Sequence, residues 1–298
     1  MLLPLDIRAM QATSASALMV LVAPAAAAVD VNALWDFGKP ALSEERFRAA
    51  LATAQGDDVV ILKTQIARTW SIRREFAQAL RVLAEVEPQL GQVGPEARTR
   101  YFLELGRSFA SSVHKPDELT PHAKAMARNA YDSALATARA ARLDGLAVDA
   151  VHMFAFVDTS PEDSVRWADE GLKIVMASDQ PSAKNWEASL RQNRGFALMQ
   201  LKRYDEALAD FKLLLAAREK QGRLGGIRIA HWFIAKTQRL QGRLDEARDT
   251  QLRLEREWDA AGQPDPYVFE ELEALYKTRG DSERAAHYAA RLKATKTP

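Results

Sequence analysis

The sequence predicts an all-α fold, a right-handed solenoid of helix–turn–helix pairs, and three observations support this prediction. Apolar residues recur at helical spacing from Val29 onward, with short breaks between the segments. One pattern of small, bulky and aromatic residues also returns several times along the chain. Only 14 Gly and 12 Pro occur in 298 residues, which is few for a β-rich fold with many turns. About six helix pairs, some of them degenerate, account for the pattern.

The repeated unit is clearest over residues 193–214. It places a small residue at Gly195 and a bulky one at Leu198, followed by Tyr204, Ala207 and Phe211. A small residue on the first helix and an alanine on the second let the two helix axes approach closely, while the large residues fill the groove between them. The same order recurs over residues 67–86, 235–254 and 272–292, and degenerate copies span 105–134 and 146–176.

This pattern resembles the tetratricopeptide-repeat superfamily from about residue 59 to residue 292. Ala207, Ala247 and Ala285 lie 40 and 38 residues apart, a period longer than the roughly 34 residues of the standard repeat. In this the chain is similar to the extended repeats of kinesin light chain and of Rap-type peptide receptors. The stretch from Leu34 onward also resembles bacterial repeat proteins without assigned function. The resemblance implies a fold and a concave binding face, and it implies no chemistry.

Three regions are expected along the chain. Residues 1–28 are predicted to be a signal peptide, because Arg8 precedes a short apolar run at 16–23 and Ala26-x-Ala28 suits signal peptidase. Asp6 and the single cation before the run favour the alternative, an N-terminal extension of a cytoplasmic protein. Residues 29–58 form a lead-in and one helix, for which Ser43 is the expected N-cap. Residues 59–298 form the repeat array, with an insertion near 111–123.

Composition excludes several classes of function. Lys+Arg 41 against Asp+Glu 40 gives a net charge of +1, so a general nucleic-acid binder is not expected. The absence of cysteine excludes disulfides, thiolate metal sites, a Cys nucleophile and a lipid anchor on Cys. No stretch reaches the roughly 20 apolar residues of a membrane span.

No catalytic, cofactor or metal site is predicted, and the protein is not expected to be an enzyme. The sequence holds no GxSxG, HExxH, P-loop or GxGxxG motif. His114 and His122 are separated by two prolines and make a poor chelating pair. His152 lies in an apolar stretch and is expected in the core, whereas His231 suits a packing or a groove-facing role. Most paired acids, including Glu270–Glu271, are interpreted as stabilising the first turns of helices.

The resemblance implies which residues line the concave groove. Inner helices supply them, at positions offset from the packing residues. The expected groove contains more cations than anions, with aromatic contacts from three residues, and Asn193 alone matches the carboxylate clamp of chaperone-binding relatives. The groove residues are Arg68, Arg100, Arg107, Gln192, Asn193, Phe196, Trp232, Lys236, Arg239 and Tyr267, with Gln65, Leu103, Gln200, Glu270 and Lys277 beside them.

These features predict a non-catalytic scaffold that binds a protein or peptide, such as an acidic or C-terminal carboxylate segment. It would assemble a complex in the bacterial cell envelope, periplasmic or secreted, if residues 1–28 are a signal peptide. The alternative is a cytoplasmic peptide-sensing or regulatory receptor. Tyr288 and Leu292 are expected to leave an apolar edge on the last repeat, through which a weak homodimer would form.

Overall fold

The computed structural model describes residues 29–222 and 224–295, so the predicted signal peptide at residues 1–28 lies outside the described residues. Every regular element in this part of the chain is a helix. None of these helices combines the length and the apolarity that crossing a bilayer requires. In chain order they are α1 (Val31–Leu34), α2 (Pro40–Leu51), α3 (Asp57–Ile72), α4 (Phe76–Val86), η1 (Glu87–Gln89), α5 (Pro95–Phe109), η2 (Pro116–Glu118), α6 (Pro121–Ala140), α7 (Asp144–Met153), η3 (Phe154–Phe156), α8 (Pro161–Ala177), α9 (Pro181–Lys184), α10 (Glu187–Gln200), α11 (Tyr204–Lys220), α12 (Leu224–Leu240), α13 (Leu244–Ala260), α14 (Pro266–Thr278) and α15 (Ser282–Thr295).

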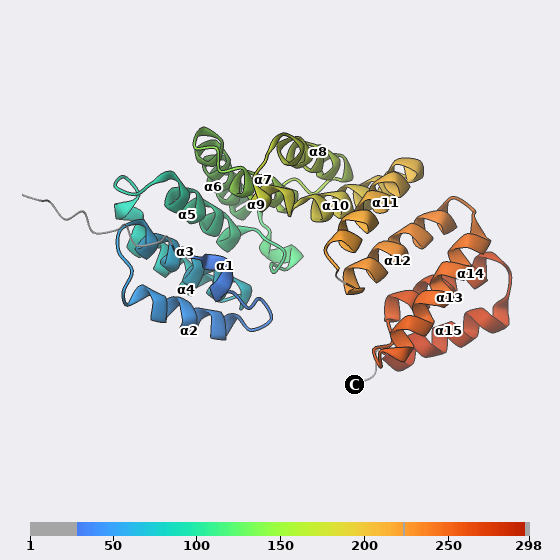
Figure 1. Cartoon of the computed structure of the whole chain (residues 1–298). Coiled ribbons are helices and arrows are strands. Elements are labelled where there is room, and N and C mark those ends of the chain that lie inside the picture. Colours follow the sequence, from blue (N-terminus) through green and yellow to red (C-terminus); the bar gives the residue numbers. More distant parts are fainter. Residues whose placement is uncertain (1–28, 223, 296–298) are drawn as a thin grey trace, which may run out of the picture.

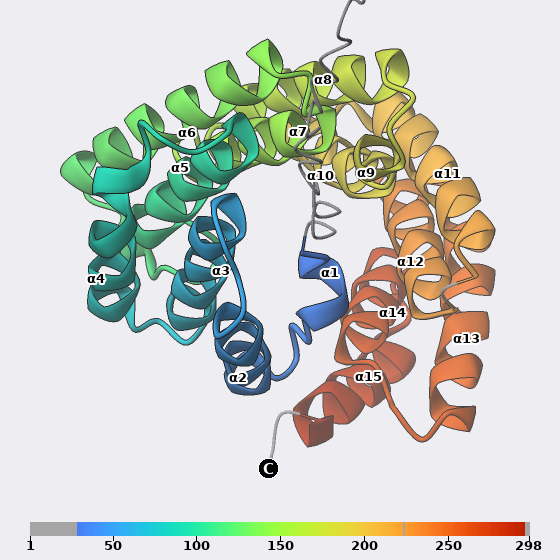
Figure 2. The ribbon, with the colours of Figure 1, turned by 60° about the vertical axis from the view of Figure 1, so that its left-hand side comes forward.

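The helices stack as antiparallel pairs into a curved solenoid (Figure 1), which confirms the predicted fold class. The pairs are α3 with α4, α5 with α6, α7 with α8, α10 with α11, α12 with α13, and α14 with α15. Seen along the arc in Figure 2, the first helix of each pair lines the inner side and most of the second helices form the outer layer. The concave face therefore belongs to α3, α5, α7, α10, α12 and α14.

Proline and short polar side chains fix where many of these helices begin. Pro95, Pro121, Pro161 and Pro266 open α5, α6, α8 and α14, where the missing N–H costs no helical hydrogen bond. The side chains of Thr120, Ser160 and Asp265 cap three of these helices by accepting backbone N–H groups.

The expected N-cap of the first long helix was wrong. α2 begins at Pro40 with Lys39 as its N-cap, so Ser43 lies inside the helix and is buried. Proline is preorganised for the first helical position, and the helix therefore starts four residues earlier than expected. The Ser43 hydroxyl instead binds the lead-in, here defined as residues 29–39. It accepts the backbone N–H of Asp36 at 2.7 Å and donates to the Asp36 carbonyl at 3.0 Å.

Close helix packing follows the small residues of the repeat. A Cβ atom at Gly195 would lie 2.6 Å from the ring of Phe211, which the next helix inserts into the space. Gly106 on α5 meets the ring of Tyr131 on α6 in the same way. In these two pairs the inner helix thus lies directly against a large side chain of its outer partner, as the sequence pattern predicts.

The connection between α5 and α6 is the longest turn within a pair, and it holds η2. Its residues pack on the preceding pair: His114 stacks on Phe76 of α4 with ring centroids 4.1 Å apart. Arg74 binds Glu118 at 2.7 Å and also donates to the carbonyl of Val113. The proline-bearing segment is thereby held on the outside of the first repeat.

Candidate partner-binding surface

The ten residues predicted to line the groove all lie on inner helices. Arg68 is on α3, Arg100 and Arg107 are on α5, and Tyr267 is in the first turn of α14. Helix α10 carries Gln192, Asn193 and Phe196, and α12 carries Trp232, Lys236 and Arg239. The structure brings them together in two places, an aromatic pocket in the C-terminal half and an ion-pair network in the N-terminal half.

The aromatic pocket is a hollow of about 450 Å³ between α10, α12 and the start of α14. The Trp232 indole N–H donates to the Tyr267 carbonyl at 3.0 Å, which joins α12 to α14. Phe196 and Trp232 both contact the buried ring of Phe233 edge-on, with centroids 6.5 and 5.0 Å away. Phe196, Ile229 and Tyr267 remain exposed around the opening, although all are large and apolar. The wall consists of Phe196, Ile229, Trp232, Phe233, Trp258 and Tyr267, with Gln192, Arg228 and Asp265 at its rim.

Cations stand over two rings of the aromatic pocket. The guanidinium of Arg228 lies 4.6 Å from the centroid of Trp258, and Lys236 Nζ lies 4.6 Å from that of Trp232. Lys236 also contacts Glu271 of α14 at 3.0 Å, and Arg239 donates to the same carboxylate at 2.8 Å. The Glu271 side chain is only 3% exposed, against 25% for Lys236 and 17% for Arg239. Two cations thus face the groove above one buried anion, so this group carries a net positive charge toward solvent.

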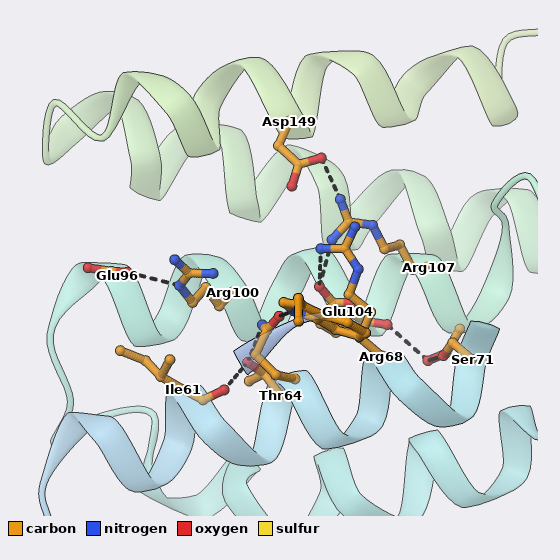
Figure 3. Close-up of polar contacts among 12 residues, drawn as sticks. Ile61, Thr64, Arg68, Ser71, Glu96, Arg100, Glu104, Arg107 and Asp149 are labelled. Atoms are coloured by element: carbon orange, nitrogen blue, oxygen red, sulfur yellow. Dashed lines mark hydrogen bonds and ion pairs between the residues drawn. The ribbon is translucent and has the colours of Figure 1, made fainter. Parts of the chain in front are cut away.

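The ion-pair network of the N-terminal half crosses three inner helices (Figure 3). Arg107 of α5 binds Glu104 at 2.6 Å and also pairs with Asp149 of α7, while Arg68 of α3 lies 3.7 Å from Glu104. Arg107, Glu104 and Asp149 are buried. Burial alone would lower the pKa of Arg107, but Asp149 and Glu104 raise it well above its usual value. Arg107 therefore keeps its charge and holds the helices together.

The cations predicted for the groove lie on inner helices, and each of them is paired with an acid. Arg68, Arg107, Lys236 and Arg239 have the acidic partners just described, and Arg100 binds Glu96 at 2.9 Å. Arg100 is paired within its own helix, whereas the other four cations are paired with acids of a neighbouring inner helix. Glu271 is one of these acids, and it is a buried ion-pair partner outside the first turn of α14. Its predicted role in helix-end stabilisation was therefore wrong.

The prediction that Tyr288 leaves an apolar edge on the last repeat was wrong. Tyr288 is buried against Tyr276 and Phe269 and donates its hydroxyl to Glu255 at 3.0 Å, so it leaves no apolar edge for a homodimer.

His152 is half-buried on α7, and burial lowers its pKa. It lines a second hollow of about 390 Å³ with Asn193 and Phe196. Among the residues that the structure describes, no group of three His, Asp or Glu side chains could hold a metal ion.

No protein-family model and no curated protein matches the chain. Several solved structures do match it. A tetratricopeptide repeat protein from Parabacteroides merdae is 14% identical over 89% of this chain and 91% of its own, with a TM-score of 0.48. Aspartyl phosphate phosphatase F from Bacillus subtilis is 15% identical over 86% of this chain and 76% of its own, with a TM-score of 0.54. PilW, a widely conserved type IV pilus biogenesis factor, is 17% identical over 79% of this chain and 93% of its own, with a TM-score of 0.56.

The chain is a tetratricopeptide-type solenoid. The paired helices, the small-residue contacts and the likeness to PilW all agree on this fold. At such low identity the likeness shows the fold alone. The residues that make the surface of this solenoid specific must be taken from its own geometry.

Several residues of the aromatic pocket were not among the predicted groove positions. Arg228 and Ile229 lie four and three residues before Trp232 on α12, so helical periodicity alone could have placed them on the same face. Trp258 comes from the outer helix α13. Only the stacking of the α12–α13 pair on α14 brings its ring to the pocket, and no sequence signal carries that information.

Proposed function

We propose that this protein is a non-catalytic scaffold that binds a segment of a partner protein on its concave face, anchored in the aromatic pocket. The observation that carries this proposal is the convergence of exposed Phe196, Ile229 and Tyr267 around one hollow. A cluster of large apolar side chains on the surface of a protein marks a binding site, because exposing them to water is unfavourable. Aromatic side chains and arginine are also enriched among the residues that contribute most to the free energy of binding at protein interfaces.

The chemistry of the pocket suggests the class of partner. An apolar or aromatic side chain would fill the hollow, and a nearby carboxylate would meet Lys236 and Arg239, which share the single acid Glu271. An acidic segment or a C-terminal carboxylate next to a bulky apolar residue satisfies both requirements. We therefore propose such a segment as the ligand.

We further propose that the scaffold assembles a protein complex in the bacterial cell envelope. The signal-peptide pattern of residues 1–28 supports this location. The likeness to a pilus biogenesis factor is compatible with it. The alternative, a cytoplasmic peptide-sensing receptor, differs in location. Fractionation of cells that express the chain with a C-terminal epitope tag separates the two. A shortened chain in the envelope fraction is expected, and an uncleaved chain in the cytoplasm would contradict the envelope proposal.

A matched pair of variants tests the binding surface. Ile229 on the concave face and Leu213 on the outer helix α11 are 44% and 46% exposed, so a charge at either position disturbs the fold equally little. Affinity purification from the native host is compared for the natural chain, Ile229→Asp and Leu213→Asp. A partner lost by Ile229→Asp and retained by Leu213→Asp is the expected result. Retention by both variants would refute the aromatic pocket as the binding surface.

A further inference from the structure

The lead-in lies inside the arc, against the concave face of the first repeat. Its short helix α1, capped by Asp30, stands on the inner side of α3 in Figure 2. Val31 is buried in the core of the first repeat, and Leu34 and Trp35 pack on the same cluster. The lead-in therefore covers the concave surface of the first repeat, whereas the corresponding surface of the later repeats is open.

Two aromatic residues of the lead-in make the principal contacts. The rings of Trp35 and Phe37 are stacked, with centroids 4.5 Å apart and planes within 4°. The Trp35 indole N–H donates to the Gln65 side-chain carbonyl at 2.9 Å. The guanidinium of Arg68 lies 5.6 Å from the Trp35 ring and 5.3 Å from the Phe37 ring. Gln65 and Arg68 are groove positions of α3, so the lead-in uses the residues that would otherwise receive a partner.

The lead-in is held by side-chain contacts of the kind that a bound peptide makes. It is also tied by the two hydrogen bonds between Asp36 and Ser43, by an edge-on contact of Trp35 with the buried ring of Phe47 at 5.1 Å, and by a long contact of 3.4 Å from the Val29 N–H to Asp58. Phe37 is 58% exposed, and its ring forms one wall of hollows of about 260 and 520 Å³ that reach across to α7. Val31 is the only buried residue among residues 29–39, and a segment that buries fewer side chains than the repeats beneath it opens at a lower free-energy cost.

We infer that the concave face of the first repeat is a second peptide-docking site, which the chain's own lead-in fills in the free protein. Its ligand class is a segment with a Trp-x-aromatic sequence, whose indole binds Gln65 and whose paired rings lie under Arg68. The tethered lead-in has a high effective concentration at this site, so an external segment binds only by displacing it. This site is separate from the aromatic pocket of α10, α12 and α14.

A labelled peptide with the sequence of residues 29–39 tests the inference on the full-length chain. In the double variant Trp35→Ala/Phe37→Ala the tethered lead-in no longer competes, and the peptide should bind at least about tenfold more tightly than to the natural chain. Adding Arg68→Ala should weaken binding several-fold, whereas adding Arg81→Ala, an exposed cation on the outer helix α4, should leave it unchanged. Equal affinity for the natural chain and the double variant, or no effect of Arg68→Ala, would overturn the inference.

Hydrogen exchange on the natural chain provides a test that needs no variant. Amides of the lead-in should exchange well before those of α3, since the segment opens while the repeat stays folded. Exchange of both regions in a single global event would show that the lead-in is a fixed part of the core, and the inference would then fail. Ile229→Asp should not alter binding of the peptide, so this test and that of the aromatic pocket can fail separately.

Discussion

Replacing Gly195 by alanine is expected to destabilise the protein, although alanine is the better helix former. In the interior of a helix that substitution alone gains about 1 kcal/mol. Against this gain, the new Cβ would lie 2.6, 2.8 and 3.0 Å from three ring atoms of Phe211. Contacts this short force the ring or one of the helices to move.

Phe211 has no free space into which it can move. The ring is fully buried and is stacked on Phe233 of α12, with centroids 4.7 Å apart and planes within 13°. Overpacking a core typically costs about 1–3 kcal/mol, and three close contacts place Gly195→Ala in the upper part of that range. The net loss in unfolding free energy is therefore about 1–2 kcal/mol.

Guanidinium denaturation followed by circular dichroism measures this loss as a lower transition midpoint. Gly225 supplies the matched control, because it lies in α12 with no atom within 4 Å of its added Cβ. Gly225→Ala should raise the midpoint by an amount worth a few tenths to about 1 kcal/mol. A midpoint for Gly195→Ala equal to or above that of the natural chain would refute the packing argument.

Two further predictions concern charges under the concave face. Glu271→Gln should lower the unfolding free energy by about 1–3 kcal/mol in the same denaturation assay, because two partly exposed cations lose their buried partner. Glu270→Gln, its exposed neighbour, should change little, and equal effects would contradict the prediction. Burial lowers the pKa of His152 in the folded protein. As the pH drops below about 6.5, the unfolded chain therefore binds a proton at this residue before the folded protein does, and the free energy of unfolding falls. His152→Gln should weaken the dependence of the melting temperature on pH in this range, and an unchanged slope would show that other groups cause it.

The repeat pattern was enough to predict the architecture. Gly195, Ala207 and Phe211 recur at fixed spacing because each pair must bury the same small and large residues against its partner, and this requirement is local. The resemblance to the tetratricopeptide-repeat superfamily also placed Phe196, Trp232 and Tyr267 on inner helices. These predictions depend on residues within one pair, which a linear sequence records directly.

The electrostatics of the surface depend on contacts between pairs, and these could not be predicted from the sequence. Glu104, Asp149 and Glu271 each bind a cation of a neighbouring helix that lies about 30 to 40 residues away in the sequence. Their register across neighbouring helices depends on how each pair is rotated on the next. The position of the lead-in is equally non-local, because no spacing rule places Trp35 against Gln65.

The two cations above Glu271 also connect the surface to the shape of the arc. Lys236 and Arg239 belong to α12 and Glu271 to α14, so their ion pairs hold one repeat at a fixed angle to the next. A ligand carboxylate that competes for Lys236 weakens a bond between repeats. By thermodynamic linkage, ligand affinity and inter-repeat angle must then influence each other to the same extent. A change in the angle between these two repeats would therefore alter how tightly such a ligand is held.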